Sequence, residues 1–164
     1  MTLQEAAQQA EELAAAGDER GLAALRQQWD EELEHAVRNA DYRLRAQAYR
    51  AIAQFRFRQK LELVRRGLQD ESPAARGSAL IALEALSRDH PGDVNGMRAM
   101  LHELATNDPN MAVRRLAIVC LKNGSAQRET ILILNGLADD DEQEADLRKT
   151  AKAVAAALTK KGRS

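Results

Sequence analysis

The chain has 164 residues and a formal net charge of −1, and its aromatic residues are one Trp, two Tyr and two Phe. The near-neutral charge argues against a protein that binds nucleic acid or an anionic membrane over its whole surface. Cys120 is the one cysteine, which excludes an internal disulfide, and the start is acidic rather than signal-like. Because no apolar stretch approaches the roughly 20 residues of a membrane span either, we expect a cytoplasmic protein.

Helix-forming residues dominate the chain, and apolar residues recur at helical spacing along almost all of it. We therefore expect an all-α protein of about nine helices that forms a single domain over residues 1–164. Its expected parts are a capping helix at residues 1–17, helical hairpins at residues 18–55, 56–88, 93–124 and 126–158, and a basic tail at residues 159–164. Ser72-Pro73 and Asp108-Pro109 predict two helix starts, each with a capping side chain before a proline at the first helical position.

One short pattern recurs in the second helix of each expected hairpin. An arginine stands at Arg45, Arg76, Arg114 and Arg148, at spacings of 31, 38 and 34 residues. Three residues later every copy has an alanine, namely Ala48, Ala79, Ala117 and Ala151, and six residues earlier stand Asn39, Asp70, Asp108 and Glu142. A small side chain at a fixed place on the apolar side lets a neighbouring helix approach closely. A period of this length is typical of a solenoid of stacked helical hairpins.

The third copy, DPNMAVRRLA at residues 108–117, resembles the second helix of a HEAT repeat, and DESPAARGSA at residues 70–79 is a degenerate version of it. The resemblance covers roughly residues 18–158 and is nearest in style to the short HEAT-like repeats of bacterial proteins and bilin-lyase (PBS-lyase-type) relatives. It implies an α–α superhelix whose second helices line the concave side. It also implies that the Asp and Arg residues form a ladder between repeats, which gives a structural role to Asp70, Arg76, Asp108 and Arg114 and extends to Arg45 and Arg148. Asn39 and Glu142 depart from the family pattern.

Charge is distributed in blocks along the chain. Residues 1–34 carry nine acidic and two basic residues, whereas residues 38–66 carry nine basic and two acidic ones. Such blocks are either solvated helix faces that pair with each other or, in the basic block, a docking patch. Tyr42, Tyr49, Phe55 and Phe57 interleave with arginines here, a pattern that single-stranded nucleic acid could use for stacking. Nucleic-acid binding through residues 43–66 is therefore one alternative function.

The sequence contains only incomplete versions of known metal-binding motifs. The stretch HELAT at residues 102–106 begins like a zinc-protease motif but lacks the second histidine, and residues 139–146 lack the glycine and the closing glutamate of a calcium loop. Cys120 falls in an apolar column of the repeat, which indicates a small buried side chain. We expect no catalytic residue, metal or cofactor, and a DNA glycosylase or a lyase subunit of HEAT-like type is the remaining enzymatic alternative.

The remaining candidate is a non-catalytic scaffold or adaptor that binds a protein or peptide on the concave face. One row of positions on the arginine-bearing helices points away from the expected core and mixes basic with apolar side chains. The predicted protein-binding residues are Arg50, Ile81, Arg115, Val119, Lys122 and Lys149. An immunity or regulatory protein, or a lyase-chaperone-type subunit that acts on a cognate protein, is a further alternative, and the sequence names no partner.

Overall fold

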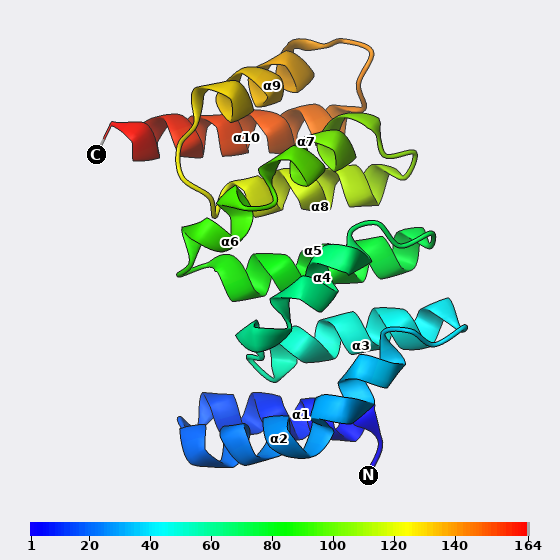
Figure 1. Ribbon diagram of the computed structural model, residues 1–164. Helices are drawn as coiled ribbons and strands as arrows, with labels where there is room; N and C mark the ends of the chain where they lie inside the picture. The colour runs from blue at the N-terminus through cyan, green and yellow to red at the C-terminus, as the bar shows by residue number, and fades with distance from the viewer. Residues whose placement is uncertain (164) are drawn as a thin grey trace. The chain divides into compact units, whose positions relative to one another are not determined.

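A computed structural model describes residues 1–163 of the chain. Within that range it contains ten α-helices, one 3-10 helix and no strand, so the predicted all-α class is confirmed (Figure 1). The count exceeds the expected nine because a short helix, α6 (Pro91–Asn95), lies where the expected hairpins at residues 56–88 and 93–124 meet. The helices are α1 (Leu3–Ala15), α2 (Glu19–Ala36), α3 (Tyr42–Gln54), η1 (Arg58–Lys60), α4 (Leu61–Gly67), α5 (Pro73–Ser87), α6 (Pro91–Asn95), α7 (Arg98–Asn107), α8 (Met111–Leu121), α9 (Arg128–Asp139) and α10 (Ala145–Gly162).

The chain forms two compact units, which are described separately. Unit 1 comprises Met1–Ala82 and unit 2 begins at Leu83, so that α5 contributes to both. The assignment of one domain to the whole chain stays a prediction.

Unit 1 is built on α1, α2 and α3, which pack against one another, with η1 and α4 on α3. Polar side chains fix where these helices begin. The Thr2 hydroxyl accepts a hydrogen bond from the Glu5 backbone N–H while the Glu5 carboxylate accepts one from Thr2, and Asp18 caps α2 in the same way through the N–H of Gly21. The largest fully buried side chains of the unit include Leu22, Leu33, Ile52, Phe55 and Leu68.

A close approach of helices in unit 1 depends on Gly67, the last residue of α4. A Cβ atom at this position would lie 2.7 Å from the Cβ of Ala79 and 2.8 Å from the ring of Tyr49. All three residues are buried, so the absence of a side chain at Gly67 allows the tight packing of α4 against α3 and α5.

In unit 2, α7 packs on α8, α9 packs on α10, and α8 lies alongside α10 (Figure 1). These two pairs lie in the segments where the sequence predicts hairpins, at residues 93–124 and 126–158. Leu101, Ile118, Leu121, Leu134 and Leu147 are fully buried between these helices.

The structure corrects one of the two predicted helix starts. Helix α5 begins at Pro73, and the Ser72 hydroxyl accepts a hydrogen bond from the Ala75 N–H as predicted. Helix α8, however, begins at Met111 rather than Pro109, and its capping side chain is Asn110, which accepts a hydrogen bond from the Val113 N–H. Asp108 and Asn110 are both residue types that can cap a helix, and α8 is capped by Asn110, which is nearer to the apolar residues of the helix.

The predicted basic tail at residues 159–164 overlaps the end of helix α10. Helix α10 continues to Gly162, and the Lys161 ammonium donates hydrogen bonds to the carbonyl oxygens of Lys122 and Gly124 at 2.7 and 2.8 Å. Lysines in the last turn stabilise the helix because they face its partly negative C-terminal end. Ser164 lies outside the described residues.

Candidate protein-binding surface

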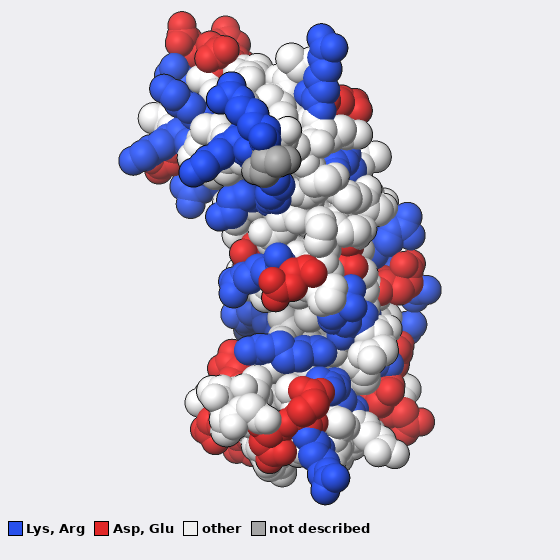
Figure 2. Space-filling model, turned by 90° about the vertical axis from the view of Figure 1, so that its left-hand side faces the viewer, with Lys and Arg blue, Asp and Glu red and all other residues white. Residues whose placement is uncertain are grey.

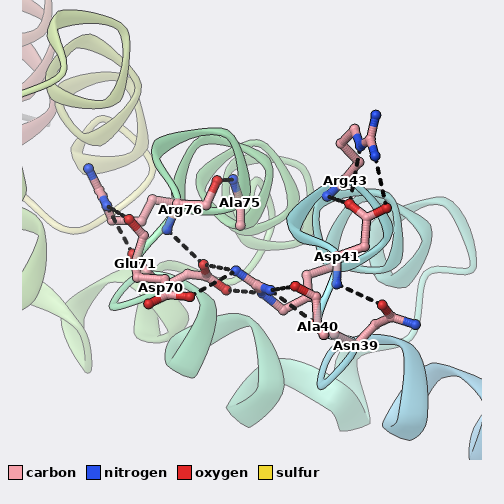
Figure 3. Close-up of polar contacts among 10 residues, drawn as sticks. Asn39, Ala40, Asp41, Arg43, Asp70, Glu71, Ala75 and Arg76 are labelled. Carbon is pink, nitrogen blue, oxygen red and sulfur yellow. Dashed lines mark hydrogen bonds and ion pairs between the residues drawn. The ribbon is translucent and has the colours of Figure 1, made fainter.

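The first repeated arginine, Arg45, joins two successive turns of unit 1, and Figure 3 labels its partners Asn39, Ala40 and Asp70 in these turns. Its Nε and Nη2 atoms each donate a hydrogen bond of 2.8 Å to the Asp70 carboxylate, and its Nη1 atom donates to the carbonyl oxygens of Asn39 and Ala40 at 3.0 and 3.2 Å. The two charged side chains are only 11% and 7% exposed. Arg45 is therefore largely buried and bound to both turns, which supports the structural role that the resemblance implies.

Electrostatics at this pair follow from its geometry. The hydrogen bond from Arg45 lowers the pKa of Asp70, and it does so despite burial, which acts in the opposite direction. The same bond raises the pKa of Arg45. Both groups are thus held in their charged forms, as two parallel N–H···O bonds to one carboxylate require.

A polar residue six positions before the arginine forms the same turn in three repeats. The side-chain oxygens of Asn39, Asp70 and Asp108 each accept a hydrogen bond from the backbone N–H two residues later, at 2.8, 2.9 and 2.9 Å. By sequence, Asn39 departs from the Asp of the family pattern. In the structure it nevertheless forms the same turn, because an amide oxygen can accept this hydrogen bond as well as a carboxylate can. Glu142 does depart, since in the fourth repeat Asp140 accepts this bond, from the N–H of Glu142.

The other three arginines also bind the segment that precedes their own helix. Arg76 donates to the carbonyl oxygens of residues 70 and 71, as Figure 3 shows, whereas Arg114 donates to that of Ala105 and Arg148 to that of Ala138. Arg114 is only 8% exposed, and its Nη2 atom has no hydrogen-bond partner within residues 1–163. These contacts support a structural role, and the complete ladder stays a prediction.

The four repeated alanines occupy equivalent places. Ala48, Ala79, Ala117 and Ala151 are all fully buried, with no exposed area. This burial agrees with the argument that the position requires a small side chain because a neighbouring helix lies against it.

Unit 2 exposes part of the predicted binding row on α8 and α10. Arg115, Val119 and Lys122 follow one another at intervals of four and three residues and so share one face of α8. Lys122 and Lys149 are exposed and Val119 is partly exposed, while the Arg115 side chain is 43% exposed. We call Arg115, Val119, Lys122 and Lys149 the unit 2 stripe.

The unit 2 stripe has acidic neighbours: Asp146 pairs with Arg115, Glu84 lies near Lys122, and Asp139 and Asp141 line the same hollow as Lys149. Arg115 lies 3.6 Å from a carboxylate oxygen of Asp146, and this pair places the start of α10 beside α8. Both side chains are substantially exposed, so this ion pair contributes little to stability and can be exchanged for another. Figure 2 shows further Lys and Arg side chains gathered over α9 and α10 at one end of the chain.

The predicted residues of unit 1 are exposed as well. Arg50 of α3 is exposed, and Ile81 of α5 has 46% of its area exposed. Their neighbours in the predicted row, Ala46 and Ala53, are buried, which leaves a narrower exposed row than the sequence suggested. The binding role of these two residues stays a prediction.

Part of the basic block at residues 38–66 pairs with the acidic block at residues 1–34, as one of the two sequence interpretations proposes. The Lys60 ammonium lies 2.5 Å from a carboxylate oxygen of Asp30 and 2.7 Å from one of Glu34. Burial lowers the pKa of Lys60, but these two hydrogen bonds outweigh it and the pKa is raised.

Most aromatic residues of the basic block are buried. Tyr49, Phe55 and Phe57 are 4%, 0% and 7% exposed, so they form part of the core of unit 1 and cannot stack on bases. Tyr42 is exposed, and Arg43 lies 6.0 Å from the centre of its ring. The nucleic-acid alternative therefore loses most of its proposed stacking residues.

Cys120 and His102, whose side chains could take part in catalysis or metal binding, are buried or hydrogen-bonded within the protein. Cys120 is fully buried, and burial raises the pKa of its thiol. His102 shares the hydroxyl of the buried Thr130 with Arg98, and burial lowers the pKa of this histidine. Among residues 1–163 no group of three His, Cys, Asp or Glu side chains could hold a metal ion, and none of the helices in that range is long and apolar enough to cross a membrane.

The structure reveals two surface hollows that sequence reasoning missed. One, of about 600 Å³ in unit 2, is lined by Asn135, Ala138, Asp139, Asp141, Arg148, Lys149 and Lys152. The other, of about 510 Å³ in unit 1, is lined by Thr2, Leu3, Gln4, Glu32, His35, Ala36, Asn39, Leu44 and Gln47. Each combines loop residues with residues of different helices, so sequence periodicity alone gives no signal for it.

Comparison with known families matches residues 31–103 to HEAT repeats. The matched segment contains the first two repeated arginines, Arg45 and Arg76, and ends before the copy at residues 108–117 that resembles the family most closely by sequence. The match confirms the resemblance to HEAT repeats over this segment. No curated protein matched the chain.

Proposed function

We propose that this chain is a non-catalytic module that binds an acidic segment of a partner protein, because residues 31–103 match HEAT repeats, which are commonly protein-interaction or scaffold modules. The proposed contact surface is the unit 2 stripe. Arg50 and Ile81 in unit 1 are proposed as further contacts of the same partner.

The observation that carries this proposal is the composition of the stripe. Arg115, Lys122 and Lys149 present three positive charges, and Asp146 is the acidic residue in ion-pair contact with them within the described chain. Val119 lies between Arg115 and Lys122 on the same helix face. A partly exposed apolar side chain with basic neighbours is typical of a surface that combines charge attraction with apolar burial.

The mechanism requires little rearrangement of the chain. Long-range attraction between the basic stripe and an acidic segment raises the rate of encounter, and this effect weakens as salt is added. On docking, a partner carboxylate replaces Asp146 beside Arg115. Burial of Val119 then contributes the apolar part of the binding free energy.

Charge reversal on the stripe tests this function. The chain is used as an affinity bait in a lysate of the cells that naturally express it, and bound proteins are quantified by mass spectrometry. A bait that carries Arg115→Glu and Lys122→Glu is expected to lose a partner that the wild-type bait retains. A matched bait that carries Arg20→Glu and Arg65→Glu has the same charge change at exposed positions of unit 1 and is expected to retain that partner.

The captured protein must also have the expected chemistry. Its purified acidic segment should bind the wild-type chain directly and with an affinity that falls as ionic strength rises. Equal capture by the two charge-reversed baits, or salt-independent binding, would remove the unit 2 stripe as the contact surface.

A further inference from the structure

The arginines of the first and fourth repeats occupy the same position of the repeat but have different partners. Arg45 holds the Asp70 carboxylate through two hydrogen bonds of 2.8 Å. Arg148 reaches Asp141 through one contact of 3.3 Å from Nη2, and its Nε atom donates at 3.3 Å to the Ala138 carbonyl. Both distances are at the long end for a hydrogen bond, so the Arg148 guanidinium is held weakly.

Exposure shows the same difference. The side chain of Arg45 is 11% exposed and that of Asp70 is 7% exposed, whereas the values for Arg148 and Asp141 are 38% and 96%. The exposed carboxylate of Asp141 gains little from one long ion contact in water, so another carboxylate can replace it at small cost.

Arg148 also borders the hollow of about 600 Å³ in unit 2. Lys149 and Lys152 supply two further positive charges to its lining, Asn135 supplies an amide, and Asp139 and Asp141 supply the acidic groups. Bases outnumber acids in this lining, and Ala138 is its one apolar side chain. The hollow is therefore suited to a polar, negatively charged group and not to an apolar one.

We propose that this hollow is a carboxylate-binding subsite that takes an Asp or Glu side chain from the acidic segment of the partner protein. The ligand carboxylate replaces Asp141 on the Nη atoms of Arg148 and is bound by two parallel hydrogen bonds, as Asp70 is bound by Arg45. Lys152 contributes a second positive charge.

The inference rests on the proposed function, because the partner supplies the carboxylate, and it adds a second contact point beside the unit 2 stripe. Lys149 belongs to both the stripe and the lining of the hollow, so one acidic segment can reach both.

The subsite can be tested by NMR on the full chain with ¹⁵N-labelled arginine side chains. The probe is an acetylated and amidated hexa-aspartate peptide, and the matched probe is hexa-asparagine. The Nε–H signal of Arg148, assigned by its absence in Arg148→Lys, is expected to shift saturably with hexa-aspartate and to stay in place with hexa-asparagine.

Arg148→Lys keeps the charge but loses the planar fork, so hexa-aspartate should bind this variant about fivefold or more weakly. Arg20→Lys, which makes the same exchange at an exposed position of α2, should leave the affinity unchanged. Circular dichroism of both variants should match that of the wild type.

Each other outcome overturns the inference in a recognisable way. If the NMR signal of Arg115 in the unit 2 stripe shifts and that of Arg148 does not, the subsite is removed and the proposed function stays intact. The absence of a shift in either signal would count against both proposals. An equal response to inorganic phosphate would identify a general anion site. Self-association that disappears in Arg148→Lys would identify a second copy of the chain as the occupant.

Discussion

Arg45 in α3 and Asp70 in the turn before α5 form a bidentate ion pair with both N–O distances at 2.8 Å and with both side chains largely buried. The same guanidinium binds the carbonyl oxygens of Asn39 and Ala40, in the turn before α3. One side chain thus fixes two successive turns of unit 1 relative to each other. Removal of either charged partner leaves a buried charge without compensation, which is among the costly changes that a single substitution can cause.

The stability of unit 1 should depend on pH through Asp70. Its pKa is lowered in the folded protein, chiefly by the hydrogen bond from Arg45, relative to the usual aspartate value of 3.8. A carboxyl group of this kind stabilises the fold fully above its unfolded pKa, and the contribution is lost as the pH falls through the lowered value. Asp70→Asn should therefore lower the free energy of unfolding by about 3 kcal/mol near pH 7, and the difference from the wild type should shrink below about pH 4.

Urea unfolding at several pH values measures this difference. Asp141→Asn is the matched control, because Asp141 is 96% exposed and makes one ion contact of 3.3 Å. The control should change the free energy of unfolding by less than about 0.5 kcal/mol. Equal effects of the two substitutions near pH 7 would show that the buried pair contributes nothing beyond a surface contact.

Two glycines should respond in opposite directions to replacement by alanine. At Gly67 the new Cβ would lie 2.7 Å from Ala79 and 2.8 Å from the ring of Tyr49, so the helices must move apart at a cost of about 1–3 kcal/mol. At Gly136, inside α9, nothing lies within 4 Å of the new Cβ, and the higher helix propensity of alanine should stabilise by about 0.5–1 kcal/mol. Thermal unfolding monitored by circular dichroism compares the two variants, and a neutral Gly67→Ala would contradict the packing described for unit 1.

Cys120 should be unreactive in the folded protein. Its side chain has no exposed area, and burial raises the pKa of the thiol, which disfavours the thiolate that reacts with disulfide reagents. Labelling with Ellman's reagent should therefore require unfolding and should accelerate sharply in urea. The comparison is Ala153→Cys in a Cys120→Ala background, since residue 153 is exposed on α10. Equal labelling rates without urea would contradict the buried position.

The repeat could be read from the sequence because it rests on side-chain type at fixed spacing. The alanine three residues after each arginine is fully buried in all four copies, as a requirement for close helix contact predicts. The hydrogen bonds in the turns were harder to predict from the sequence. Asn39 looks like a departure from the Asp of the other copies, yet it makes the same hydrogen bond, since the turn needs only a side-chain oxygen at the right distance from the backbone.

The binding surface could be predicted only in part. Helical spacing identified Arg115 and Lys122 as exposed neighbours on one face of α8, but the contact of Arg115 with Asp146 depends on how α10 lies beside α8. The hollow at Arg148 likewise requires the arrangement of α9 and α10 and of the turn between them. Local sequence patterns do not show which helices pack against each other when they are distant in the sequence.

The central claim is that Arg45 is a structural clamp, whereas the neighbouring Arg43 is a surface residue. Arg45→Gln and Arg43→Gln test it most directly, since the same exchange is made two residues apart, at side chains that are 11% and 75% exposed. In urea unfolding near pH 7, Arg45→Gln should lower the free energy of unfolding by about 3 kcal/mol and Arg43→Gln by less than about 1 kcal/mol. Equal losses, or a larger loss for Arg43→Gln, would contradict the account.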